Sequence, residues 1–155
     1  MDIRALPVPA NLLGESPLWH PQEQVLYWCD IPGRQLHRFD PANGQHQQWD
    51  FHTEVACCAA RAQGGLLLAL RDGLWHFNPT DGSRTQVATA PYPQATERFN
   101  DGKVDAQGRF WCGTIHEPRD APSASLYRWA DGQMQRAAGD ITVSNGLAWS
   151  PSGRT

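Results

Sequence analysis

The stretch RFNDGKVDAQGRFWCGT, residues 98–114, holds the information from which the fold can be predicted. It begins with a polar cluster at 98–101, continues through a tight-turn signal at 105–108 and ends in a short apolar run at 110–112. The second half of this pattern recurs along the chain, whereas the polar cluster does not. We therefore expect the recurring half to build a scaffold and the polar cluster to belong to a site.

The recurring feature is a turn that leads into an apolar strand. The four turns start 41, 44 and 45 residues apart, and they are His20–Glu23, Arg61–Gly64, Asp105–Gly108 and Ser150–Gly153. The apolar runs that follow the first three turns are Val25–Cys29, Leu66–Leu70 and Phe110–Cys112. A second strand then runs into another turn at 36–41, 74–79 and 126–132. Because the same elements recur in the same order, the pattern indicates an internal repeat.

A repeat of about 40–45 residues with four short strands is typical of one blade of a β-propeller. No window shows the apolar spacing of an amphipathic helix, so the expected class is all-β. The predicted blades are 16–52, 55–90 and 98–140, and a fourth begins at Ser144. The alternative is a β-sandwich whose turns resemble one another by accident. Closed propellers have about 4–8 blades, so the 155 residues are expected to form the N-terminal part of a longer propeller.

The composition argues against several classes of partner and location. A net charge of −3 and a pI near 6 give no basic surface for nucleic acid or an anionic membrane. No apolar run approaches the roughly 20 residues that span a bilayer, and no secretion signal is evident at the start of the sequence. The four cysteines form no Cys-x-x-Cys pair, and three lie in apolar runs. We therefore predict a cytoplasmic protein with buried free thiols rather than disulfides.

Three polar clusters are predicted just before the innermost strands of blades, at 14–17, 98–101 and 144–147. In a propeller the loops that enter the innermost strands surround the mouth of the central channel, so these clusters would converge there. Glu15 and Asn145 offer hard oxygen atoms that suit calcium, magnesium or manganese. Arg98 and Asn100 would orient a ligand rich in hydroxyl groups. Taken singly, Asn145-Gly146 and Asn100-Asp101-Gly102 are more often turns than ligands, and Glu15 is an exposed acid. Only their shared position in the repeat makes a site as good an interpretation as turns.

Several motifs together resemble the gluconolactonase / senescence-marker-protein (regucalcin) family. They appear in order as Gly14–Pro17 with Trp19, Arg98–Lys103 with Asp105 and Gly108-Arg109, Gly113-Thr114, and Ser144–Leu147 with Trp149-Ser150. The resemblance runs from about residue 14 to the end of the chain. It implies a six-bladed propeller that holds one divalent cation, which is calcium, zinc or manganese, and that hydrolyses a small-molecule sugar lactone.

The resemblance also implies roles for particular residues. Glu15 and Asn145 correspond to metal ligands, while Arg98, Asn100 and Glu117 correspond to residues that contact the lactone. The third ligand of the family, an aspartate that also acts as the general base, is expected beyond Thr155, so no catalytic base is predicted within these 155 residues. The expected function is therefore metal-dependent lactone hydrolysis by the full-length form. The alternative is a non-catalytic propeller segment that binds calcium or a protein partner.

Overall fold

The computed structural model describes residues 3–153 and contains three four-stranded antiparallel sheets. The first sheet is formed by β1 (Gly14–His20), β2 (Val25–Asp30), β3 (Gln35–Asp40) and β4 (Gln45–Asp50). The second is formed by β5 (Val55–Ala60), β6 (Leu66–Leu70), β7 (Gly73–Phe77) and β8 (Arg84–Thr89). The third is formed by β9 (Glu97–Val104), β10 (Phe110–His116), β11 (Ala124–Ala130) and β12 (Gln133–Ile141). The described residues form no helix, and hence none that is long and apolar enough to cross a membrane. The predicted all-β class is confirmed.

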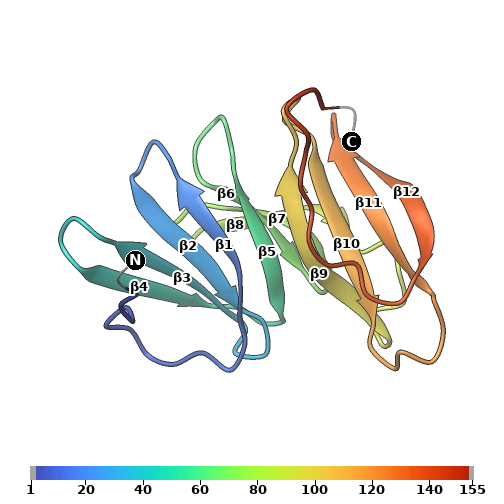
Figure 1. Cartoon of the computed structure of the whole chain (residues 1–155), viewed down its shortest axis with the longest axis horizontal. Helices are drawn as coiled ribbons and strands as arrows, with labels where there is room; N and C mark the ends of the chain where they lie inside the picture. The colour runs from blue at the N-terminus through green and yellow to red at the C-terminus, as the bar shows by residue number, and fades with distance from the viewer. Residues whose placement is uncertain (1–2, 154–155) are drawn as a thin grey trace.

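Each sheet is a simple meander in which the strands pair in sequence order. The sheets stand side by side, and their first strands converge (Figure 1). β5, the first strand of the second sheet, contacts both β1 and β9. The fourth strands, β4, β8 and β12, lie at the opposite edges of their sheets. We interpret each sheet as one blade whose first strand is the innermost.

The core consists of two apolar layers, one on each face of the second sheet. Tyr27 and Leu36 pack with Leu68 between the first and second sheets, whereas Leu67 packs with Phe99 between the second and third. Because successive strand residues point to opposite faces, every residue of β6 is buried against one neighbour or the other. Burial decreases outward, and the residues of β8 are exposed or only partly buried.

The four cysteines lie in these two layers, and all are buried and free, as predicted. Cys57 and Cys58 are adjacent in β5 and point to opposite faces. The Cys57 sulfur lies 3.5 Å from that of Cys112 in the third sheet, and Cys58 packs in the same buried cluster as Cys29 of the first sheet. Burial and the neighbouring thiol raise the pKa of Cys57 well above its usual value.

Two of the three predicted polar clusters lie within innermost strands, not before them as the sequence predicted. Residues 14–17 belong to β1, and residues 98–101 belong to β9. Each innermost strand carries a β-bulge where it pairs with the second strand, near Ser16, Ala56 and Asn100. A bulge keeps the strand paired while it re-aims the side chains around it. This is how polar residues are accommodated at the centre without ending the strand.

Residues 142–153, where the start of a fourth blade is predicted, form no further sheet within the part of the chain that the structure describes. Val143 bridges to Ile115 of β10, and the indole nitrogen of Trp149 donates to the Val104 carbonyl over 3.2 Å. The segment therefore runs along the third sheet (Figure 1). This path brings residues 144–147 beside β9.

Candidate functional site

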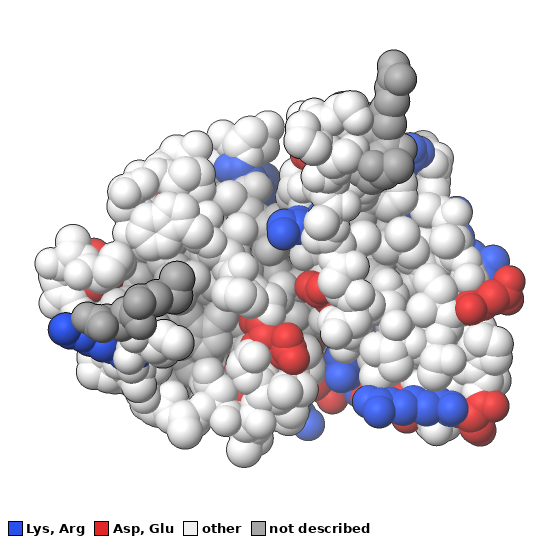
Figure 2. Space-filling model, in the orientation of Figure 1, with Lys and Arg blue, Asp and Glu red and all other residues white. Residues whose placement is uncertain are grey.

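A cavity of about 270 Å³ opens where the first strands of the sheets converge. It is lined by residues of β1, of β9 and of the segment after β12, namely Glu15, Ser16, Pro17, Asp101, Gly102, Lys103, Gly146 and Leu147. Figure 2 shows acidic side chains near the middle of the face turned toward the viewer, between the first and third sheets. Glu15 thus borders the cavity, and Asn145 directly precedes Gly146, which also lines it. Both predicted metal ligands are exposed.

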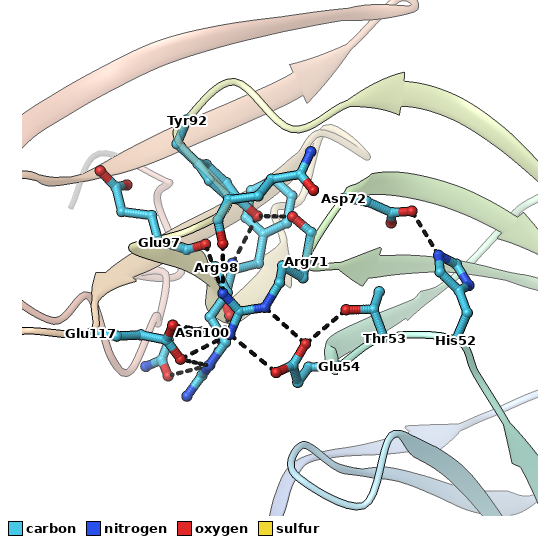
Figure 3. Close-up of polar contacts among 12 residues, drawn as sticks. His52, Thr53, Glu54, Arg71, Asp72, Tyr92, Glu97, Arg98, Asn100 and Glu117 are labelled. Atoms are coloured by element: carbon cyan, nitrogen blue, oxygen red, sulfur yellow. Dashed lines mark hydrogen bonds and ion pairs between the residues drawn. The ribbon is translucent and has the colours of Figure 1, made fainter.

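The residues predicted to contact substrate form a second cluster at β9. The Arg98 guanidinium lies 3.3 Å from the Glu117 carboxylate and donates to the Asn100 side-chain oxygen over 3.2 Å. Burial lowers the pKa of Arg98, although the nearby Glu117 acts in the opposite direction. The three side chains, which come from β9 and the loop after β10, are therefore brought together (Figure 3).

Asn100 connects this cluster to the segment that carries Asn145. Its side-chain nitrogen donates to the Ser144 carbonyl over 2.9 Å, while its side-chain oxygen accepts from Arg98. The bulge in β9 lies at this residue, because Asp101 pairs with Gly113 and Phe99 pairs with Thr114, which leaves Asn100 unpaired. The predicted lactone contacts and the predicted cation ligands thus belong to one connected region.

Sequence reasoning missed two charged residues of this region. Arg71 lies between two acids, and its guanidinium contacts Glu54 at 2.8 Å and Glu117 at 2.9 Å (Figure 3). Burial alone would raise the pKa of Glu54, but hydrogen bonds from Arg71 and Thr53 outweigh it and lower the pKa to about 2. The available signal was that Glu54 directly precedes β5, at nearly the same point of the repeat as the other clusters. The signal is weak because β5 itself is entirely apolar and carries no polar cluster.

The donor chemistry of the region fits a hard cation only in part. Glu15 supplies a carboxylate at the cavity and Asn145 supplies an amide oxygen, and hard cations prefer oxygen ligands. Among residues 3–153, no three His, Cys, Asp or Glu side chains are grouped so that they could hold a metal ion. The chain therefore contributes two candidate ligands but not a complete carboxylate cage.

The sequence matches a known protein family and is similar to known lactonases. Residues 13–155 match the family model described as the SMP-30/Gluconolactonase/LRE-like region. The chain is 44% identical over 142 residues to a 6-deoxy-6-sulfogluconolactonase of Pseudomonas putida, covering 91% of this chain and 49% of that protein. It is 36% identical over 138 residues to a pentonolactonase of Haloferax volcanii, covering 88% of this chain and 46% of that protein.

Solved structures agree with the fold. A calcium-binding regucalcin from Agrobacterium tumefaciens superimposes with a TM-score of 0.87 at 28% identity, covering 92% of this chain and 48% of that one. A gluconolactonase from Xanthomonas campestris gives a TM-score of 0.73 at 25% identity, covering 91% of this chain and 52% of that one. The chain thus spans about half the length of the curated relatives it matches, and its three sheets correspond to part of a propeller.

Proposed function

The chain belongs to the SMP-30/gluconolactonase/LRE-like family, and we propose that the full-length protein hydrolyses a sugar lactone with the help of one bound divalent cation. The observation that carries this proposal is the position of Asn100. Its side chain contacts Arg98 on one side and the carbonyl of Ser144 on the other. A ligand held by Arg98 would therefore lie next to the segment that carries Asn145.

We assign Glu15 and Asn145 to holding the cation, which we propose to be calcium, zinc or manganese. Both residues belong to segments that border the 270 Å³ cavity. A cation bound there would supply Lewis-acid polarisation of the lactone carbonyl. The regucalcin of Agrobacterium tumefaciens is described as a calcium-binding protein, which supports calcium as the first ion to test.

The lactone itself would be oriented by the cluster on β9. Arg98 has several N–H donors in a fixed plane and suits an electron-rich ligand that carries hydroxyl groups. Glu117 and Asn100 hold this guanidinium in place. The names of the relatives support an aldonolactone, and the Pseudomonas putida relative makes a 6-sulfonated gluconolactone a specific candidate. General-base help in activating water is worth about 10²–10⁴-fold, and we assign that base to a residue beyond Thr155.

The test is a lactone-opening assay on the natural full-length protein, with gluconolactone and its 6-sulfonated analogue as substrates. Acid release is followed with EDTA and with added Ca²⁺, Mn²⁺ or Zn²⁺. We expect Glu15→Gln to lower kcat/KM by about 10²-fold, because the cation loses its charged ligand. Asp50→Asn is the matched control, since it makes the same charge change on the exposed outer strand of the same sheet. It should change kcat/KM by less than about twofold.

Hydrolysis that survives both EDTA and Glu15→Gln would contradict the metal-dependent mechanism. The second candidate is a propeller that binds calcium without hydrolysing a lactone, and the calcium-binding neighbour supports keeping it. Calorimetric Ca²⁺ binding that depends on Glu15, together with no turnover of either lactone, would favour this candidate.

A further inference from the structure

Two consecutive residues of β9 hold the peptide groups on either side of Asn145. The Asn100 side-chain nitrogen donates to the Ser144 carbonyl over 2.9 Å. The backbone N–H of Gly146 donates to the Asp101 carboxylate over 2.8 Å. The donor and acceptor groups are 44 and 45 residues apart in the sequence, so these contacts fix one strand against a distant segment.

Consecutive residues of a regular strand point to opposite faces, and two neighbours would not ordinarily contact the same segment. The bulge in β9 removes this restriction. Asp101 pairs with Gly113 and Phe99 pairs with Thr114, so Asn100 is the additional residue between them. The altered direction of the side chains at the bulge is what lets Asn100 and Asp101 contact one segment together.

The segment is also held from the side of β10. The Ser144 N–H donates to the Thr114 carbonyl over 2.9 Å. A Cβ atom on Gly113 would lie only 2.0 Å from the Ser144 hydroxyl oxygen, so the close approach of the segment requires glycine at 113. The Asp101 carboxylate is itself oriented by a second bond, which it accepts from the Gly102 N–H over 2.8 Å.

We propose that Asp101 is a positioning residue that fixes the backbone of Asn145 through the Gly146 N–H, so that the Asn145 side chain is preorganised to bind a cation. The role of Asn145 in this inference rests on the proposed function, whereas the contact between Asp101 and Gly146 does not. With the flanking peptide groups held by Asn100 and Asp101, mainly the side-chain torsions of Asn145 remain to be ordered on binding. Supporting residues of this kind typically change metal affinity by about 10–100-fold.

The test compares Asp101→Ala with Glu15→Ala in the natural full-length protein. Amide hydrogen exchange of Gly146 is measured in EDTA, and Mn²⁺ affinity is measured by calorimetry. We expect Asp101→Ala to accelerate Gly146 exchange by about 10-fold or more and to weaken Mn²⁺ binding by about 10–100-fold. Glu15→Ala should abolish Mn²⁺ binding but leave Gly146 exchange unchanged, because that amide donates to Asp101 and not to Glu15.

Asp101→Asn, which keeps the shape and one acceptor oxygen, should show intermediate exchange and guards against loss of folding in the alanine variant. Thermal unfolding of each variant checks that the fold is retained. Gly146 exchange that is unchanged in both Asp101 variants would overturn the proposal. So would weaker Mn²⁺ binding without faster exchange, because Asp101 would then be a direct ligand. If the unmodified protein binds no Mn²⁺, the proposed function fails, while the exchange data still decide the positioning role.

Discussion

Arg71 shows how one partly buried cation organises several acidic groups. It contacts Glu54 and Glu117 through its guanidinium and also donates to the Gln94 carbonyl over 2.8 Å. Its hydrogen bond with Glu54 is the main reason that the pKa of Arg71 is raised. Without Arg71, the two carboxylates would lie near each other with one positive charge fewer between them. The network therefore sets the charge at the predicted lactone-contacting cluster as well as its shape.

A pH dependence of stability follows from Glu54. Its pKa is lowered in the folded protein from the usual 4.5 to about 2, so the unfolded chain binds its proton at higher pH than the folded one. This contribution is fully present above about pH 4.5 and is lost as the pH falls toward 2. We expect the free energy of unfolding, measured with urea, to fall more steeply in that window for the natural protein than for Glu54→Gln. Identical slopes in the two proteins would contradict the role of this pair.

The Asp105 carboxylate accepts several hydrogen bonds in the turn between β9 and β10. Its carboxylate accepts from the Gln107 N–H over 3.0 Å, the Arg109 N–H over 2.9 Å and the Trp111 indole over 2.8 Å. Its side chain is 3% exposed. We expect Asp105→Ala to lower the free energy of unfolding by about 2–3 kcal/mol, because several partly buried donors lose their acceptor.

The matched control for this prediction is Asp81→Ala, in the turn between β7 and β8. Asp81 is exposed, and its carboxylate accepts from the Ser83 N–H over 2.8 Å. Its loss should shift the urea midpoint much less than the loss of Asp105. Similar shifts in the two variants would mean that the bonds of Asp105 add little beyond an ordinary turn.

At the residue scale, the sequence predicted the polar groups of the site but not their connections. Arg98 and Asn100 belong to a polar cluster in the sequence, whereas Glu117 follows only from the family resemblance. The structure places the three side chains in contact. Arg71 and Glu54 carry no motif, because their proximity to the cluster arises only when the second and third sheets pack together. Contacts of this kind depend on the spacing between blades, which no local pattern contains.

At the scale of elements, the tight connection from β6 into β7 allows only one residue type at position 73. Gly73 has φ of +145°, and a Cβ atom there would lie 2.0 Å from the Ala88 carbonyl oxygen of β8. That oxygen belongs to a paired strand and cannot move away without disturbing the pairing. We expect Gly73→Ala to cost about 3 kcal/mol in the free energy of unfolding.

Gly82 supplies the comparison, since it also has positive φ, +73°, but a Cβ atom at this position would meet no atom within 4 Å. Gly82→Ala should cost only about 1 kcal/mol, the strain of the left-handed conformation. Urea unfolding of both variants separates the two effects. Equal losses would show that the collision with Ala88 is relieved by a backbone shift.

The repeated turns and apolar runs could be predicted because each depends on residues close in sequence. The run at 66–70 is β6, and the runs at 25–29 and 110–112 lie in β2 and β10. The bulges could not be predicted, because a bulge is a mismatch of register between two strands and is invisible in either strand alone. The sequence therefore predicts residues 98–101 before the innermost strand, whereas the structure places them within it.

At the scale of the whole molecule, the four thiols report on contact between the sheets. Cys57 contacts Cys112 between the second and third sheets, while Cys29 and Cys58 pack in one buried cluster between the first and second. All four are buried, and burial raises the pKa of Cys57. We expect labelling by a disulfide reagent to be at least ~100-fold slower in the native protein than in urea. Rapid modification of any one cysteine under native conditions would show that its sheet interface opens independently.

The number and order of sheets follow from the repeat, and the family comparisons agree with a propeller architecture. The path of residues 142–153 does not follow from it. The repeat predicts the start of another blade there, whereas the segment lies along β9 and β10 through Val143 and Trp149. The reason is physical: a strand needs a partner with free backbone groups. The end of β10, past the residues that pair with β11, offers such groups to residues 142–144.

The outward decrease in burial has a practical consequence. Residues of β5 and β6 are almost all enclosed, whereas those of β4 and β8 are exposed or only partly buried. Tolerance of substitution should therefore increase from the axis toward the rim. Fluorophores, affinity tags or immobilisation handles are best attached in the outermost hairpins, for example between β7 and β8, where they add bulk away from the residues that border the central cavity.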